Sequence, residues 1–216
     1  MNPDIPGGST LVLASNNQGK LQELTDLLAP LNLTLKTQRE LGVDEAEEPA
    51  VTFLENALIK ARHASRITGL PALADDSGLS VPALKGQPGV RSARYSGADA
   101  TDASNIDALL DAMQEITGKD RAATFHCVLV FLRHADDPTP IICHGQWHGE
   151  VLTQRRGDEG FGYDPIFWVP STQCSAAELS RAEKSRISHR GQALRQLVQS
   201  LGGHALSPTA TDDSHQ

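Results

Sequence analysis

The chain has 216 residues, which is enough for one large domain to bury a core without disulfide or metal staples. Its 19 Lys and Arg residues against 27 Asp and Glu residues give a formal net charge of −8. That balance argues against a surface that coats nucleic acid, but not against a site for one small anionic ligand. With 39% hydrophobic and 21% charged residues, the composition is typical of a globular protein and excludes a disordered or fibrous one.

The sequence predicts neither a membrane span nor a secretory signal. The longest clear apolar run, residues 127–132, is the size of a strand, far short of the roughly 20 residues that a membrane helix needs. The first residues include prolines and glycines but no basic segment followed by an apolar one. The three cysteines, Cys127, Cys143 and Cys174, form no CxxC pair, which favours a reducing compartment. We therefore expect a cytoplasmic protein.

The N-terminal third of the chain predicts a strand, a polar loop and two helices. Residues 11–14 are an apolar run with a β-branched centre, and polar residues 15–20 follow at once. Leucines at helical spacing then predict a helix over residues 21–31. The next helix is expected to begin at Thr52, whose hydroxyl can cap a backbone N–H, and to end at Gly69.

The rest of the chain mixes strands and helices irregularly. The short run 75–78 (Asp-Asp-Ser-Gly) is rich in turn formers, and we expect it to be a strand end that opens into a tight loop. A helix is predicted over residues 102–113 and a last helix from about Ser188. Residues 123–132 and 141–151 predict two long strands joined by a turn.

This order of elements favours an α/β domain on a long, twisted, mixed β-sheet over a regular βαβ series. We expect one domain over residues 11–201, with a flexible leader at residues 1–10 and a flexible, small and polar tail at residues 202–216. No internal repeat or mid-chain linker interrupts that domain.

Residues 15–20 (Ser-Asn-Asn-Gln-Gly-Lys) are a candidate phosphate site. They lie where a strand gives way to a helix, so hydroxyl, amide, backbone N–H and ammonium donors gather beside a helix N-terminus. The spacing matches neither a P-loop nor a dinucleotide fingerprint. A capped helix with a solvated lysine explains the same residues.

Two groups of carboxylates are candidate metal ligands. Glu45, Glu47 and Glu48 precede the adjacent pair Asp75 and Asp76, and such oxygen ligands suit Mg²⁺ shared with substrate phosphates. One of the paired aspartates could hold a metal while the other takes a proton from water. A solvated acidic loop and a simple turn are the alternative interpretations.

Residues 161–165 (Phe-Gly-Tyr-Asp-Pro) place a glycine between two aromatic residues and could present a ring on which a nucleobase stacks. Lys184 and residues 188–191 add cationic and planar donors near a helix start. Aromatic packing at the edge of a core and ordinary surface charge on a capped helix are the alternatives.

Several histidines and cysteines on the two long predicted strands invite a zinc interpretation. His126-Cys127 and Cys143-His144 supply ligand types, but no pair has the usual short ligand spacing. The strand pattern accounts for their apolar members, so we do not adopt a zinc site.

Five motifs, in this order, resemble the inosine triphosphate pyrophosphatase family. They are residues 15–20, residues 52–57 with Lys60, residues 74–78, residues 161–165, and Lys184 ahead of residues 188–191. The resemblance extends from about residue 11 to residue 201, nearly the whole chain. Five motifs in register are far more specific than any one of them.

The resemblance implies Mg²⁺-dependent hydrolysis of the non-standard purine nucleotides ITP, dITP and XTP to the monophosphate and pyrophosphate. Such an enzyme cleanses the nucleotide pool and prevents incorporation of these nucleotides into DNA and RNA. The resemblance also implies a two-lobed fold on a long central sheet, a nucleotide cleft between the lobes, and a homodimer.

Carried over position by position, the resemblance assigns Asp76 as general base and metal ligand, with Glu48 as a second metal ligand. The implied substrate-binding residues are Ser15, Asn16, Asn17, Gln18, Gly19, Lys20, Lys60, Ser77, Phe161, Gly162, Tyr163, Asp164, Lys184, His189 and Arg190. The three lysines would neutralise the triphosphate. Donors from His189 or Arg190 would favour the 6-oxo group of hypoxanthine or xanthine over the 6-amino group of adenine.

Two other functions are open at this point. A pyrophosphatase on the same fold could act on other modified or pyrimidine nucleotides, or a nucleotide-binding protein could sense such a ligand without hydrolysing it. The carboxylates Glu48, Asp75 and Asp76 favour catalysis, because a protein that only binds an anion gains little from them without a metal. A polynucleotide-binding module is disfavoured by the charge of −8 and by an aromatic content of 4%.

Overall fold

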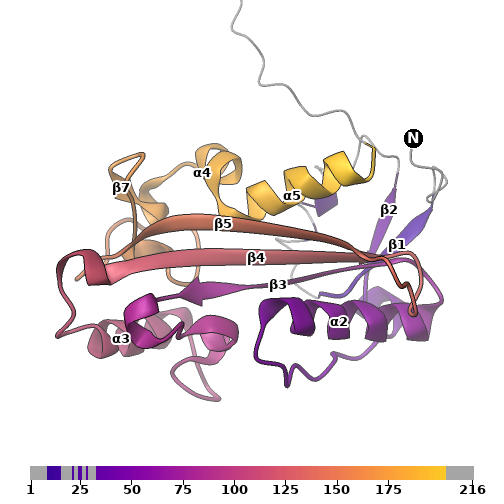
Figure 1. The fold of residues 1–216 in the computed structure, drawn as a ribbon, viewed down its shortest axis with the longest axis horizontal. Helices are drawn as coiled ribbons and strands as arrows, with labels where there is room; N and C mark the ends of the chain where they lie inside the picture. The colour runs from indigo at the N-terminus through magenta and orange to yellow at the C-terminus, as the bar shows by residue number, and fades with distance from the viewer. Residues whose placement is uncertain (1–8, 16–20, 22–23, 26–27, 29–32, 203–216) are drawn as a thin grey trace, which may run out of the picture.

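A seven-stranded mixed sheet forms the centre of the protein, in the strand order β2–β1–β3–β4–β5–β6–β7 (Figure 1). The computed structural model describes residues 9–15, 21, 24–25, 28 and 33–202. The strands are β1 (Thr10–Leu13), β2 (Thr34–Thr37), β3 (Ala72–Ser80), β4 (Ala122–Leu132), β5 (Ile141–Val151), β6 (Phe167–Val169) and β7 (Cys174–Ser175). The helices are α2 (Phe53–Thr68), α3 (Asp102–Ala112), α4 (Arg181–Ile187) and α5 (His189–Ser200).

The long antiparallel strands β3, β4 and β5 are the spine of this sheet. β3 pairs with β4 at every residue from Ala72 to Ser80. The parallel strand β1 pairs with β3, among the described residues, only at Val12↔Ala72 and Leu13↔Leu73. β3 therefore continues well past the end of β1.

Helices cover both faces of the spine: α2 and α3 lie on one side of β3 and β4, and α4 and α5 on the other (Figure 1). α2 packs through Ala57, Ala61 and Ala64, which are fully buried and repeat at helical spacing. Small side chains let the helix approach the sheet closely. Side chains alternate along β4, so Phe125 and Phe131 share one face but belong to two separate cores.

The structure confirms the α/β class and the long mixed sheet, together with most of the predicted elements. Thr52 caps α2 through the Glu55 N–H, and Gly69 ends it in a left-handed conformation (φ 67°). The helix predicted over residues 102–113 and the one predicted from Ser188 are α3 and α5, and the long predicted strands are β4 and β5. The short strands β2, β6 and β7 and the helix α4 were not anticipated.

The interpretation of residues 75–78 as a loop at a strand end is wrong. These residues lie in the middle of β3, hydrogen-bonded in register from Asp75↔Leu129 to Gly78↔His126. Their turn propensity is overridden because the apolar strand β4 offers a ladder along their whole length.

Part of what was predicted for the ends of the chain lies outside the described residues. Of the expected leader at residues 1–10, Ser9 and Thr10 are described, and Thr10 already begins β1. Of the expected tail at residues 202–216, Gly202 is described. In the helix predicted over residues 21–31, the four described positions (21, 24, 25 and 28) are helical. No helix of the described segments is long and apolar enough to cross a membrane.

We expect Gly145→Ala to destabilise the fold where β5 meets α5. A Cβ at Gly145 would overlap the His189 carbonyl oxygen and come within 2.9 Å of the Ala193 nitrogen. Because both neighbours are backbone atoms, α5 must shift, and we expect a loss of about 2 kcal/mol in the free energy of unfolding, measured by urea denaturation. Gln146→Ala, at the exposed neighbouring position, is the control. An unfolding midpoint for Gly145→Ala equal to that of the control would contradict this packing.

Candidate active site

Strand β3 carries two groups of functional side chains on its opposite faces. Because side chains alternate along a strand, Asp76 projects toward α2, whereas Asp75 and Ser77 project to the other face. Beyond Leu73 this part of β3 lies past its pairing with β1.

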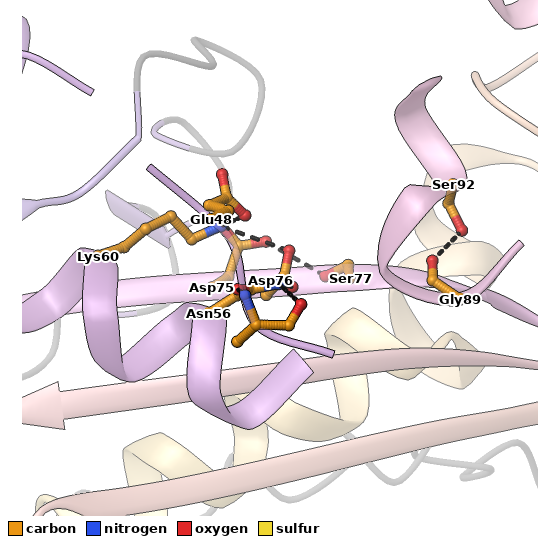
Figure 2. A network of polar contacts seen from close by, with 9 residues as sticks. Glu48, Asn56, Lys60, Asp75, Asp76, Ser77, Gly89 and Ser92 are labelled. Atoms are coloured by element: carbon orange, nitrogen blue, oxygen red, sulfur yellow. Dashed lines mark hydrogen bonds and ion pairs between the residues drawn. The ribbon is translucent and has the colours of Figure 1, made fainter. Parts of the chain in front are cut away.

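On the first face, Lys60 of α2 joins two carboxylates (Figure 2). Its Nζ lies 3.1 Å from Glu48 Oε2 and 3.4 Å from Asp76 Oδ1. Asn56, one turn earlier on α2, places its Nδ2 3.4 Å from Asp76 Oδ2. The spacing of four residues puts Asn56 and Lys60 on the same face of the helix, toward Asp76.

Asn56 also fixes the segment that carries Glu48. Its Oδ1 accepts a hydrogen bond from the Ala50 N–H (3.0 Å) and its Nδ2 donates to the Ala50 carbonyl (3.4 Å). The side chain is fully buried, so these bonds replace its contacts with water. The Asn56 amide thus contacts Asp76 and also fixes the backbone two residues after Glu48.

On the second face, Asp75 is buried (4% exposed) and its Oδ2 accepts a hydrogen bond from Ser77 Oγ at 3.2 Å. Figure 2 shows Asp75, Asp76 and Ser77 in sequence along the strand, with Lys60 and Glu48 on one side of them. We name the group Glu48, Lys60, Asp75 and Asp76 the carboxylate cluster.

Burial and like charge raise the pKa of Asp76 above its ordinary value. Desolvation is the largest cause; Glu48 and Asp75 add to it, and Lys60 with Asn56 offsets part of it. The pKa of Lys60 is also raised, because attraction to Asp76, Asp75 and Glu48 outweighs its own desolvation. Lys60 thus stays an ammonium, while Asp76 moves toward the range in which a carboxylate works as a general base.

The carboxylate cluster fits a divalent cation that is completed by substrate oxygens. Within the described residues, no three His, Cys, Asp or Glu side chains are grouped as ligands of one ion. Mg²⁺ commonly takes one or two protein carboxylates and fills its other positions with water and phosphate oxygens. Three carboxylates against one ammonium leave an excess of negative charge that a cation would offset. Glu45 and Glu47 are exposed.

A cavity of about 690 Å³ opens beside the carboxylate cluster, and Ser77 and Gly78 of β3 form part of its wall. Its volume lies in the range of small-molecule sites. The predicted substrate residues that line it are Ser77, Phe161, Gly162, Tyr163, Asp164, Lys184, His189 and Arg190. These eight residues come from four separate stretches of the sequence and are brought to one pocket next to the carboxylates.

Phe161 is the one aromatic ring of its motif that the fold presents. It is 57% exposed, and Lys184 Nζ and Arg190 Cζ lie 4.8 and 5.5 Å from its ring centroid. Tyr163 is 3% exposed and donates its hydroxyl to the Ser92 carbonyl at 2.8 Å. Of the two aromatic residues of this motif, Phe161 is therefore the one that offers an exposed ring, because Tyr163 is a core residue.

A buried ion pair holds the loop that carries Phe161. Asp164 Oδ2 pairs with Lys184 Nζ and accepts a hydrogen bond from the Phe161 N–H at 2.8 Å. A Cβ at Gly160 would overlap Asp164 Oδ2, and this glycine also has a positive φ of 83°. The structure thus places Lys184 beside the aromatic ring.

His189, the first residue of α5, forms the floor of the pocket as a neutral imidazole. Its ring stacks on Phe125 with centroids 4.8 Å apart and an interplanar angle of 11°. Burial, and then the charges of Arg190 and Lys184, lower its pKa well below the ordinary value. Its buried Nδ1 has no hydrogen-bond partner among the described residues.

Some of the predicted site residues lie outside the described part of the chain. Ser15 is described two residues after the end of β1, whereas Asn16, Asn17, Gln18, Gly19 and Lys20 lie outside the described residues. Sequence reasoning assigned no role to Asn56, Ser92, Asp102 or Asn105, although each contacts or lines the site. Two sequence signals could have pointed to them: an amide, Asn56, within the first turns of α2, and two polar residues, Asp102 and Asn105, three positions apart in α3.

The comparison with known proteins decides the family. The Ham1 family model matches residues 11–200. The chain belongs to the Ham1 family. Its match covers both the carboxylate cluster and the pocket.

Relatives of this Ham1 protein are named dITP/XTP pyrophosphatase. Those from Shigella flexneri and Escherichia coli K12 are 58% and 57% identical over 191 residues, covering 88% of this chain and 97% of each relative. A HAM1 protein from Coxiella burnetii has a similar solved structure, with a TM-score of 0.87 and 53% identity over 89% of this chain and 98% of its own. The Staphylococcus aureus Ham1 protein gives a TM-score of 0.82 and 37% identity, covering 89% of this chain and 97% of that one.

Replacing the ammonium in the carboxylate cluster should raise the pKa of Asp76 further. In Lys60→Met the charge that offsets burial is gone, so protonation of Asp76 is expected at higher pH than in the wild type. Carbon-detected NMR titration of the side-chain carboxyls measures both midpoints. Glu40, whose pKa is lowered by hydrogen bonds from Thr37, is the internal control and should not move. An unchanged Asp76 midpoint would remove Lys60 from this electrostatic role.

Proposed function

We propose that this chain hydrolyses non-standard purine nucleoside triphosphates, namely ITP, dITP and XTP, to the monophosphate and pyrophosphate. One observation carries the proposal: the carboxylate cluster and a cavity large enough for a nucleoside adjoin each other on β3, at Asp76 and Ser77. The relatives named dITP/XTP pyrophosphatase, 57–58% identical, support the same reaction. The cellular role would be removal of these nucleotides before they enter DNA or RNA.

In this proposal the base stacks on Phe161 and the polar pocket residues recognise its edge. His189 and Arg190 lie at the N-terminus of α5, in the wall of the cavity. Donors at these positions match the 6-oxo group of hypoxanthine or xanthine and oppose the 6-amino group of adenine. Each mismatched buried donor costs about 1 to 3 kcal/mol, enough for roughly ten- to hundredfold discrimination.

The triphosphate would extend from the pocket toward the end of β1. Ser15 is described close to that end, and the proposed phosphate segment continues in the sequence with Asn16, Asn17, Gln18, Gly19 and Lys20, which lie outside the described residues. Lys60 supplies a further positive charge, since its raised pKa keeps it protonated. Such local cations let a protein of net charge −8 bind a polyanion.

Glu48 and Asp76 would hold Mg²⁺, which when bound would help to neutralise the charge of the substrate phosphates. Asp76 would accept the proton of the attacking water as the general base. Ser77 orients the substrate from the pocket side, with its hydroxyl fixed by Asp75. Attack at the α-phosphorus then releases pyrophosphate, whose developing charge Lys60 helps to stabilise.

We also propose that residues 11–201 act as one two-lobed unit with the nucleotide between the lobes, and that the protein is a cytoplasmic homodimer. Separate cores at the two ends of the long strands support the two-lobed arrangement. The buried thiols Cys127 and Cys143 are typical of a reducing compartment, where the nucleotide pool also lies. The homodimer rests on the family resemblance.

Product analysis tests the reaction directly. With Mg²⁺, the wild type is expected to convert ITP and XTP rapidly, and GTP and ATP slowly, to the monophosphate and pyrophosphate. Asp76→Asn should lose at least about a hundredfold in kcat because the proton acceptor is gone. Asp136→Asn, at an exposed surface pair, is the control and should keep wild-type turnover.

Each other product pattern would contradict a particular part of this proposal. Diphosphate and phosphate as products would refute attack at the α-phosphorus. Tight ITP binding without turnover would indicate a sensor. A preference for pyrimidine or other modified nucleotides would overturn the purine assignment, and near-normal turnover by Asp76→Asn would remove that residue as the base.

Base selectivity tests the role of Arg190. Arg190→Ala should lower the ratio of kcat/KM for ITP over ATP by roughly ten- to hundredfold, because a donor to the 6-oxo group is lost. Arg186→Ala, an exposed arginine on α4, serves as the matched control and should keep the ratio. If Arg190→Ala keeps the wild-type ratio, base discrimination must come from another group.

A further inference from the structure

The first turn of α3 connects the two walls of the pocket. Asp102, the first residue of the helix, lines the cavity, and its Oδ2 accepts a hydrogen bond from the Gly162 N–H at 2.7 Å. The two residues are 60 positions apart in the sequence. Because the acceptor is a carboxylate, this bond belongs to the stronger, charge-assisted class.

One turn later, Asn105 holds the opposite wall. It is buried (3% exposed), its Oδ1 accepts the Ser96 N–H at 2.9 Å, and its Nδ2 donates to the Ala93 carbonyl at 3.1 Å. Positions three apart lie on the same side of a helix, so Asp102 and Asn105 face the pocket together. α3 is thereby fixed against one wall while Asp102 reaches the loop that carries Phe161.

The three residues that follow Phe161 are each tied to a different element. Tyr163 is held by the Ser92 carbonyl, and Asp164 by Lys184 of α4. Gly162 has no side chain and a left-handed backbone (φ 60°), so its N–H is its one donor, and Asp102 receives it. This bond thus holds the residue that directly follows the exposed ring.

We propose that Asp102 is a positioning residue for nucleobase recognition: through the Gly162 N–H it fixes the loop so that the Phe161 ring is set for stacking. The inference rests on the proposed function, since it assumes that a purine occupies this cavity. Asp102 acts on the base end alone, because its partner lies in the aromatic loop and not in the carboxylate cluster. Its loss should therefore weaken binding of the base and leave binding of the phosphates intact.

The test compares two ligands by calorimetry, IMP and inorganic tripolyphosphate. In Asp102→Ala, we expect the Kd for IMP to rise roughly tenfold and the Kd for tripolyphosphate to stay within about twofold of the wild type. In turnover, KM for ITP should rise in the same proportion while kcat changes little. Asp102→Asn should restore most of the IMP affinity, because its amide oxygen can accept the same N–H.

Two further variants separate positioning from general loss of structure. Asp107→Ala removes an exposed acidic residue of the same helix that pairs with Arg155, and should leave both affinities unchanged. In a Phe161→Ala background, Asp102→Ala should cause no further loss of IMP affinity, because the ring through which it acts is absent.

Three outcomes would overturn the inference. Unchanged IMP affinity in Asp102→Ala removes the positioning role. An equal loss for IMP and tripolyphosphate, or a full additional loss in the Phe161→Ala background, shows a general structural effect instead. A wild-type protein that binds no IMP overturns the proposed function together with this inference, whereas intact wild-type binding with unaffected variants overturns this inference alone.

Discussion

The ammonium of Lys60 pairs with Glu48 and Asp76 and also attracts Asp75 on the other face of β3, and the arrangement of the site depends on that interaction. Partly buried carboxylates repel one another, so without Lys60 and the amide of Asn56 this part of β3 would lack compensation for its charge. The compensation is incomplete, as the raised pKa of Asp76 shows. A site that keeps excess negative charge in this way is suited to receive a cation. Through that bound cation, a protein with net negative charge can bind a polyanion.

Strand geometry explains how residues for phosphate chemistry and residues for base recognition can be neighbours in the sequence. Had residues 75–78 formed a loop, neighbouring side chains could have pointed in any direction. Pairing with β4 forces them to alternate, so Asp76 faces Lys60 while Ser77 faces the pocket. A reacting phosphate and a recognised base can thus be handled by adjacent residues.

The sequence predicted those features that depend on local interactions. The cap at Thr52, the glycine at 69 and the long strand over residues 141–151 have local signals, and the matching elements were found. Residues 75–78 were misjudged because pairing with a distant strand overrode their turn propensity. Tyr163 looked like Phe161 in sequence, yet its burial depends on Ser92, 71 residues away. Contacts between residues so far apart in the sequence have no local signature. The motifs therefore identified the residues, but not which of them is buried and which is exposed to the pocket.

The aromatic loop shows why such distant contacts matter to function. Phe161 stays exposed, although burial of its ring would be favourable, because Gly162, Tyr163 and Asp164 are each held by another element. A ring held in place before the ligand arrives loses little conformational freedom on binding, so more of the stacking energy is kept as affinity. The cations Lys184 and Arg190 beside it keep an otherwise apolar surface attractive to an anionic nucleotide. The same contacts that hold the loop rigid therefore also prepare it for its ligand.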